Sequence, residues 1–516
     1  CNFSFLCYFW KIKYNCIFSP LSVKNDKGDF FMEIFNNINK NIEYLENIFE
    51  DCGDVVKRKI PIGQNKESSI YVIYIDDMVN RETIESTVLE NLMINIRIAP
   101  PDRDITNENA MEILTDGGIT TADLKECENM EDAVDEVLVG NTAVFFDNSC
   151  RAIIISSKGF PKRSVDKPDT EAVVQGPQEA FTESVRTNTV LVRRRIKTPL
   201  LKCKSLKLGK KTKTDIALMY IEGTVKNSLL NSITKKLNKI KSLDVLDSGY
   251  VEQMIEENKY SPFPQVQMTE RPDKTASALL EGRVAVIVDT SPFVLLLPTI
   301  LASFYQSSED YYERWEIMSF IRIIRYICGF FAFSLPALYI AITLFHPSMI
   351  PTDLALKISG SRAPVPINTV FEVVLLELIF EALREAGIRL PQAIGSTLGI
   401  VGGIIIGQAA VEAGLISPMV VIIVSLTGIC SFAIPNISLV SAFRLLKYFM
   451  ILLSSIFGML GFAVGVFMVL THLCSLKSFG KAYVSPFNSQ SFKSVFQDTV
   501  FRFPLDKMKE SSYKEE

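Results

Sequence analysis

The chain has 516 residues, of which 48% are hydrophobic and 22% are charged, and its formal net charge at pH 7 is −4. This length accommodates two or three domain-sized units, and the average charge is uninformative because the basic residues are concentrated locally. The ten cysteines are scattered without a C-x-x-C pair, which argues against a disulfide framework and for reduced thiols in a cytosolic setting.

The first 30 residues do not have the order of a signal peptide. An aromatic run comes first, and Lys11 and Lys13 follow it rather than precede it. A signal peptide needs basic residues before its apolar run and small residues at a cleavage site. We therefore expect a leader of uncertain role at residues 1–30 and a cytoplasmic domain after it.

Residues 31–197 are predicted to form a first small α/β subdomain, because short β-rich runs such as IYVIYI alternate with longer stretches of helical pattern. The expected elements are a strand at 70–75, a helix at 81–94, a β-hairpin of 143–146 with 152–156, a helix from 176 to 186 and a strand at 189–196.

Residues 198–290 are predicted to form a second α/β subdomain. It contains expected strands at 215–221 and 284–288 and a helix at 226–240. Ten Lys and Arg residues and no acid lie between Arg193 and Lys213. This pattern fits either attachment to an anionic membrane surface or a solvated loop between the subdomains.

Residues 291–476 are predicted to form a multi-pass α-helical membrane domain, with a polar tail at 477–516. Apolar runs near 20 residues are long enough to cross a hydrocarbon core about 30 Å thick. Crossing helices are expected at 327–345, 394–411, 415–434 and 449–473. The apolar run 292–304 is shorter, so a crossing and a re-entrant or interfacial segment both remain open.

Basic residues flank the last predicted crossing on both sides. Arg444 and Lys447 precede it, and Lys477 and Lys481 follow it. Both ends are therefore expected inside the cell, which a single crossing cannot satisfy. The topology of residues 449–473 stays open at this point.

Several long stretches of the chain are distinctive. They include QGPQEAFTESVRTNTVLVRRRIKTP (175–199), SPFPQVQMTERPDKTASALLEGRVAVIVDTSPFVLLLPT (261–299), LPALYIAITLFHPSMIPTDL (335–354), EALREAGIRLP (381–391), GQAAVEAGLISP (407–418) and HLCSLKSFG (472–480). These stretches resemble the A subunit of the GerA-type nutrient germinant receptors of spore-forming bacteria. The likeness runs from about residue 40 to about residue 487, so the sequence assigns no function to the last 25 or so residues.

The resemblance implies a cytoplasmic N-terminal region and a membrane domain in the inner membrane of the spore. It also implies a receptor with a permease-like B subunit that binds the nutrient and a lipoprotein C subunit. In this family the A subunit resembles an ion-conducting homo-oligomer, commonly a pentamer, which opens to monovalent cations when the nutrient binds.

Glycines recur every four residues in the predicted crossing at 394–411, at Gly395, Gly399, Gly403 and Gly407. On a helix they form one smooth ridge, which favours close packing of membrane helices. The opposite face carries the set Thr397, Val401, Ile404 and Gln408. Polar groups around a Val/Ile belt suit a pore lining with a hydrophobic gate, whereas the alternative is that Val401 and Ile404 face lipid.

Glu377, Glu381 and Glu385 also recur every four residues, in a predicted helix at 370–386. Because carboxylates are costly in hydrocarbon, we expect them to face a wet cavity, a partner or the headgroup region. A ring of them, one set from each subunit, would attract cations. The alternative is an amphipathic helix in the membrane interface, in which Glu381 and Glu385 pair with Arg384 or Arg389.

The sequence contains no constellation typical of catalysis, so we expect a non-enzymatic protein with no catalytic residue, metal ligand or cofactor and no nucleic-acid partner. Membrane lipids and the two receptor subunits are the expected partners. The first hypothesis is a nutrient-gated cation channel subunit. The rivals are a secondary transporter and a non-conducting, signal-transmitting scaffold.

Overall fold

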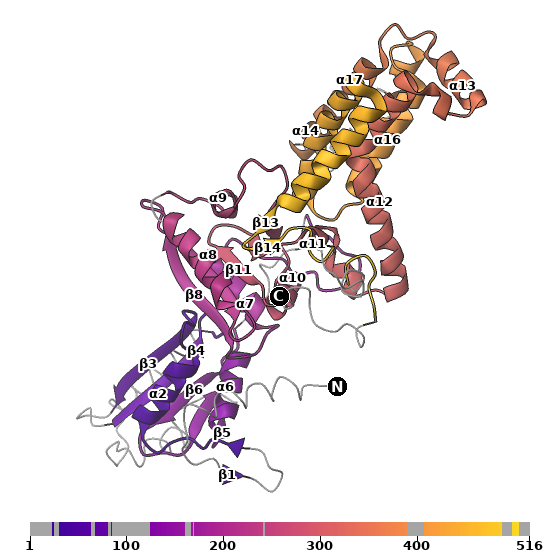
Figure 1. The fold of residues 1–516 in the computed structure, drawn as a ribbon. Coiled ribbons are helices and arrows are strands. Elements are labelled where there is room, and N and C mark those ends of the chain that lie inside the picture. The colour runs from indigo at the N-terminus through magenta and orange to yellow at the C-terminus, as the bar shows by residue number, and fades with distance from the viewer. Residues whose placement is uncertain are drawn as a thin grey trace. The chain divides into compact units, whose positions relative to one another are not determined.

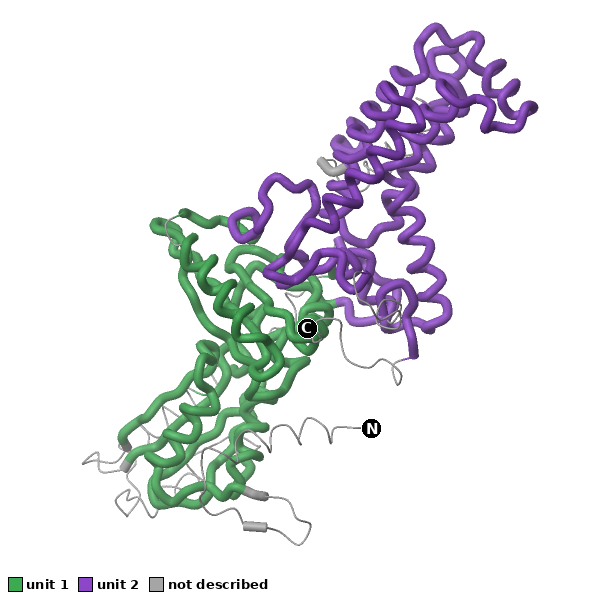
Figure 2. The backbone as a smooth tube through the Cα atoms, in the orientation of Figure 1, with its two compact units in different colours: residues 1–168, 179–251, 270–295 green, residues 169–178, 252–269, 296–516 purple. Residues whose placement is uncertain are grey.

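The computed structural model describes residues 23–24, 30–62, 68–80, 84, 124–159, 167–168, 170–240, 243–389, 407–487 and 498–504. The chain forms two compact units, one of residues 1–168, 179–251 and 270–295, and one of residues 169–178, 252–269 and 296–516 (Figure 2). Two antiparallel sheets with helices are followed by a helical part with two long apolar helices (Figure 1). The predicted fold class is thus confirmed.

Five antiparallel strands form the first sheet, in the order β3-β4-β6-β7-β5. In strand β4, which pairs with β3 and β6, Tyr71 and Ile73 pack into the core that includes α2 and α6, while Ile70 and Val72 pack into a second core. This alternation has the period of two that a strand imposes. The elements are α2 (Ile38–Ile48), β3 (Val55–Ile62), β4 (Ser68–Ile75), β5 (Leu124–Cys127), α6 (Met130–Val139), β6 (Thr142–Phe146) and β7 (Ala152–Ile155), preceded by β1 (Val23–Lys24) and β2 (Phe30–Phe31).

The predicted strand at 70–75 and the predicted hairpin are both present. The hairpin pairs β6 with β7, and its turn contains Asn148 with a φ of 59°. The predicted helix at 81–94 lies outside the described residues, apart from the helical Ile84.

The prediction for residues 176–196 is wrong, because the helix covers residues 185–193 and so occupies most of the segment where a strand was expected. Helix α7 runs over Val185–Arg193, and its N-cap Ser184 accepts a hydrogen bond from the backbone of Thr187. The Asn188 side chain fixes the preceding segment by bonding the backbone N–H and C=O of Thr182, at 2.8 and 2.6 Å. These local side-chain contacts outweigh the strand propensity of the β-branched residues in VRTNTVLV.

The second sheet has the strand order β10-β12-β11-β9-β8. Its elements are β8 (Leu201–Leu208), β9 (Thr214–Ile221), α8 (Asn227–Ile240), α9 (Ser248–Ile255), β10 (Gln267–Thr269), α10 (Pro272–Leu280), β11 (Val284–Val288) and β12 (Val294–Leu297). The predicted elements at 215–221, 226–240 and 284–288 are all present. The basic stretch is not one loop, because it contains the end of α7 and all of β8.

A buried ion pair joins the two sheets within the first unit. Arg193 of α7 donates from Nη2 to Asp54 Oδ1 at 2.8 Å, and both side chains are 1% exposed. Burial alone would lower the pKa of Arg193, but the Asp54 carboxylate outweighs it and raises that pKa. Backbone bonds from Gly53 to Cys203 and from Cys203 to Asp51 continue the connection. The two subdomains are therefore held together by polar contacts as well as by packing.

The second unit contains the long helices. Its elements are α11 (Leu301–Tyr305), η3 (Ser308–Tyr311), α12 (Trp315–Ile340), the π-helical turn η4 (Ala341–Phe345), η5 (Pro347–Met349), α13 (Thr352–Arg362), α14 (Thr369–Arg389), α16 (Pro418–Phe432), α17 (Ile437–Ser475), β13 (Lys477–Ser478) and β14 (Lys481–Ala482). Among the described residues, Trp315–Phe345 and Ile437–Ser475 are long and apolar enough to cross a membrane. Helix α16, inside the predicted crossing 415–434, has 15 residues. The short apolar run 292–304 forms β12 and α11.

Helix α17 is a hairpin of two helical legs. Gly458 has φ 60° and ψ −135°, a conformation outside the helical region. Beyond it the chain folds back, since a Cβ on Gly465 would lie 2.6 Å from the sulfur of Met450. The rings of Phe443 and His472, one from each leg, both lie near Phe263. We call residues 437–457 the first leg and residues 459–475 the second leg.

Candidate functional site

Helix α14 begins at a polar junction of three helices. The Asn368 side chain accepts a hydrogen bond from Val370 N, which satisfies one backbone donor of the first turn. Glu372 is fully buried and accepts from the backbone N–H of Ser417, the N-cap residue of α16, at 3.0 Å. Its other oxygen lies 3.6 Å from Arg362 Nε at the end of α13. Glu372 therefore ties together the ends of α13, α14 and α16.

Farther along α14, Glu377 forms an ion pair with Lys447 of the first leg of α17. The two residues are 1% and 4% exposed, so the pair is buried inside the helical unit. The Glu377 side chain is thus directed at another helix and away from the surroundings of the unit.

One turn later, Glu381 faces the same leg. It accepts a hydrogen bond from Arg444 Nε at 3.1 Å and lies 3.9 Å from Lys447 Nζ. On its own helix it lies 3.5 Å from Arg384 Nη1. Glu377 and Glu381 are four residues apart on one face of α14. Arg444 and Lys447 are three residues apart on one face of the first leg, which runs antiparallel to α14, so the two faces pair residue by residue.

Arg384 is held between aromatic rings as well as beside Glu381. Its guanidinium carbon lies 5.3 Å from the ring centre of Phe380 and 5.6 Å from that of Phe432, on α16. We call Glu377, Glu381, Arg384, Arg444 and Lys447 the α14–α17 charge cluster. With two carboxylates and three cations, its formal charge is +1.

The charge cluster lies near the middle of the helices that carry it. Lys447 is ten positions into the first leg, which corresponds to about 15 Å of rise in a leg about 30 Å long. Charged side chains at such a depth in a membrane are expensive and mark functional sites by default. In the arrangement seen here, each carboxylate of the cluster is neutralised by cations of α14 or α17.

The sequence-predicted carboxylates are brought together only in part. Glu377 and Glu381 lie in one cluster, while Glu385 lies on the exposed side of α14. The pairing of Glu381 with Arg384, which belonged to the interfacial alternative, is present.

Most of the predicted pore helix lies outside the described residues. This applies to the ridge residues Gly395, Gly399 and Gly403 and to Thr397, Val401 and Ile404 on the opposite face. Gly407 is described, and a Cβ there would lie 3.7 Å from Val421 of α16. Gln408 is exposed and donates a hydrogen bond to Glu412 at 3.0 Å.

Sequence reasoning missed the basic half of the charge cluster. Arg444 and Lys447 were interpreted as charges that orient the last crossing, and their pairing with α14 was not predicted. The available signal was their three-residue spacing in an otherwise apolar segment, which matches the four-residue spacing of Glu377 and Glu381.

This chain is similar in sequence to known proteins over most of its length. The family model "Bacillus/Clostridium GerA spore germination protein" matches residues 43–513. Spore germination protein KA of Bacillus subtilis is 41% identical over 483 residues, which cover 92% of this chain and 87% of that protein. Spore germination protein A1 of the same organism is 43% identical over 383 residues, which cover 74% of this chain and 79% of that protein.

One solved structure is also similar. It is the N-terminal domain of the A subunit of the Bacillus megaterium spore germinant receptor GerK3, at 33% identity and a TM-score of 0.40. The alignment covers 52% of this chain and 96% of that one.

The family match extends beyond residue 487, where the resemblance was expected to end. The expectation that the last 25 or so residues depart from the family is therefore wrong. Proteins of this family are not enzymes, which agrees with the prediction from the sequence. The chain belongs to the GerA family of spore germination proteins, the family of germinant-receptor A subunits.

Proposed function

We propose that this chain is the channel-forming A subunit of a nutrient-gated receptor in the inner membrane of the spore. In this proposal its α/β region lies in the cytoplasm and its helical unit crosses the membrane several times. It assembles as a homo-oligomer, a pentamer, with a permease-like B subunit that binds the nutrient and a lipoprotein C subunit. Opening admits monovalent cations and starts germination.

The observation that supports conduction best is the α14–α17 charge cluster. A subunit that only held its partners in the bilayer would be served by apolar helix contacts, because replacing a buried ion pair by apolar residues is often neutral or stabilising. A set of five charged residues near mid-length of the helices, with Glu377 and Lys447 buried and the other three partly exposed, instead fits a protein that moves charge across the membrane.

The gating step of the proposal follows from this pairing. In the closed state the carboxylates of Glu377 and Glu381 are occupied by Lys447 and Arg444. A movement of α14 relative to the first leg would free them to attract cations, since rings of carboxylates favour cation entry. The Val401 and Ile404 belt supplies the hydrophobic constriction, and the glycine ridge on the other face permits close packing.

The test is cation flux across membranes that contain this chain and its two partner subunits. Val401→Ala should raise the flux without nutrient at least about tenfold, because a wider and less apolar constriction is easier to hydrate. The matched control is Ile422→Ala, which removes an apolar side chain that is 57% exposed on α16. The control should leave the resting flux unchanged.

Three other outcomes would count against parts of the proposal. Nutrient-dependent flux in the native complex with an unchanged Val401→Ala variant would keep the channel and move the pore to the Glu377 helix. A correctly assembled native complex without nutrient-dependent flux would favour the scaffold. Saturable, substrate-dependent transport by this chain alone would favour the secondary transporter.

A further inference from the structure

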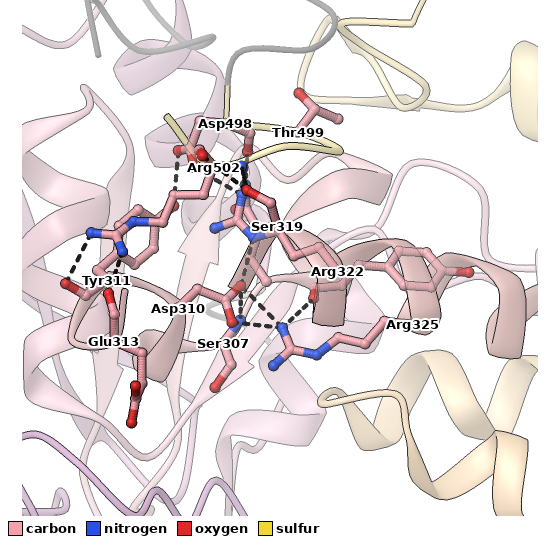
Figure 3. A network of polar contacts seen from close by, with 12 residues as sticks. Ser307, Asp310, Tyr311, Glu313, Ser319, Arg322, Arg325, Asp498, Thr499 and Arg502 are labelled. Carbon is pink, nitrogen blue, oxygen red and sulfur yellow. Dashed lines mark hydrogen bonds and ion pairs between the residues drawn. The ribbon is translucent and has the colours of Figure 1, made fainter. Parts of the chain in front are cut away.

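The residues at 498–502 lie against the base of α12, as Figure 3 shows. This short C-terminal segment, which we call the strap, is separated from the last described residue of the β14 region, Phe487, by ten residues. Thr499 and Arg502 are only 3% and 4% exposed. Such burial is unusual for a polar tail and requires specific contacts.

Asp498 binds α12 through Arg322. Arg322 Nη1 donates to the Asp498 carboxylate and to its backbone oxygen, both at 2.9 Å (Figure 3). The hydroxyl of Tyr311 donates to the other carboxylate oxygen at 2.8 Å. The site therefore recognises both the acidic side chain and the backbone of this residue.

At the other end of the strap the charged side chain is a donor, whereas Asp498 is an acceptor. Arg502 donates from its guanidinium to the backbone oxygens of Glu313 and Tyr311. Ser319 of α12 bonds the strap backbone twice, donating to the oxygen of Arg502 at 3.0 Å and accepting from its N–H at 3.1 Å. The strap thus presents an acid and a base, four residues apart, to groups of opposite character.

The receiving surface is itself fixed by a buried acid. Asp310 is fully buried and accepts from Arg322 Nε at 2.7 Å and from Arg325 Nη1 at 2.7 Å. Its backbone is set by a capping box with Ser307. Asp310 therefore orients Arg322 so that a second face of its guanidinium is available for Asp498.

We propose that the base of α12 is a peptide-docking site, that its occupant is the strap of the same chain, and that docking restrains the start of α12. The chemistry that defines the occupant is an Asp in a turn, with φ 62°, followed by three spacer residues and an Arg. The family match to residue 513 includes this segment, so the strap belongs to the family domain and is more than a tail. The inference concerns docking and does not depend on ion conduction.

The experiment is hydrogen–deuterium exchange on the full chain in lipid nanodiscs that hold one copy each. Asp498→Asn should speed amide exchange in residues 498–504 and 315–325 by about 10- to 100-fold, since charge-assisted hydrogen bonds are lost. The matched control is Asp353→Asn on α13, an exposed acid far along the chain from the strap. The control should leave both segments unchanged.

A second measurement covers the case in which the Asn variant folds poorly. A chain that ends before residue 498 should bind a labelled peptide of residues 498–504, measured by fluorescence anisotropy. The same peptide with Arg502→Ala should bind at least about tenfold more weakly, because it loses the bonds to the two backbone oxygens.

Three results would overturn the inference. One is native exchange in residues 498–504 as fast as in an unprotected peptide. Another is faster exchange in residues 498–504 of Asp498→Asn while residues 315–325 stay protected, which would show that docking does not restrain α12. The third is protection that vanishes in single-copy nanodiscs and returns in multi-copy ones, which makes a second copy the occupant. These exchange measurements do not depend on cation flux, so they can be interpreted even if the complex fails to conduct cations.

Discussion

Lys447→Met is the sharpest perturbation of the α14–α17 charge cluster. The substitution removes the ammonium group and keeps most of the side-chain volume, so packing changes little. It leaves Glu377, which is 1% exposed, without the cation that it contacts in the native protein. The expected result is a large loss of stability with the backbone arrangement retained.

The magnitude can be bounded in two ways. Removing one partner of a buried ion pair costs about 3–5 kcal/mol. Alternatively, Glu377 takes up a proton to avoid a buried charge. For a carboxyl group with an ordinary pKa of about 4.3, this costs about 3.7 kcal/mol at pH 7. Both routes give a loss of about 3–4 kcal/mol in the free energy of unfolding.

The assay is a double-mutant cycle of unfolding in bicelles at pH 7, with Lys447→Met, Glu377→Gln and the double variant. The double variant should recover most of the loss, since no unpaired charge remains. The loss in Lys447→Met should also shrink as the pH falls toward 5, because protonating Glu377 then costs less. A loss below about 1 kcal/mol, or one without this pH dependence, would refute the buried pairing.

Two further predictions concern the buried ion pair between Arg193 and Asp54 and the turn of the α17 hairpin at Gly458. Asp54→Asn should destabilise the protein by about 3–5 kcal/mol because it leaves Arg193 buried and unpaired, while Asp215→Asn, at an exposed pair, should cost under about 1 kcal/mol in the same thermal-unfolding assay. Gly458→Ala should cost at least about 1–3 kcal/mol, because its backbone conformation excludes a Cβ that would also lie 2.6 Å from the Phe345 ring. Gly360→Ala has nothing within 4 Å of the new Cβ and should be neutral or slightly stabilising.

Local patterns predicted the sheets well, because they depend on residues near in sequence. The runs at 70–75, 215–221 and 284–288 are apolar and β-rich, and each became a strand. The failure at 189–196 also arises from residues near in sequence, but through specific side-chain bonds. There the β-branched residues favour a strand, but the bonds between Asn188 and Thr182 set up a helix, and such contacts cannot be derived from propensity.

The charged residues of the membrane unit show a different limit. Their spacing predicted that Glu377 and Glu381 share a helix face, and this holds. Their partners lie 63 and 70 positions away, and pairing at such separations depends on how the helices pack. Arg322 of α12 shows the same limit, because its contacts are Asp310 and a residue 176 positions later.

The hairpin in α17 removes a conflict that the sequence could not resolve. Basic residues at 444 and 447 and at 477 and 481 all favour the inner side, and one crossing places them on opposite sides. Because the chain turns at Gly458, the start of the first leg and the end of the second lie at the same end of the unit, where Phe443 and His472 both approach Phe263. The start of the first leg can then lie on the same side as Lys477 and Lys481, while Arg444 and Lys447 lie farther along that leg and pair with α14. Hydropathy alone predicts one continuous helix here, because no charged residue lies between Phe449 and Leu473. In the structure the two legs are separated by the non-helical backbone of a single residue, Gly458.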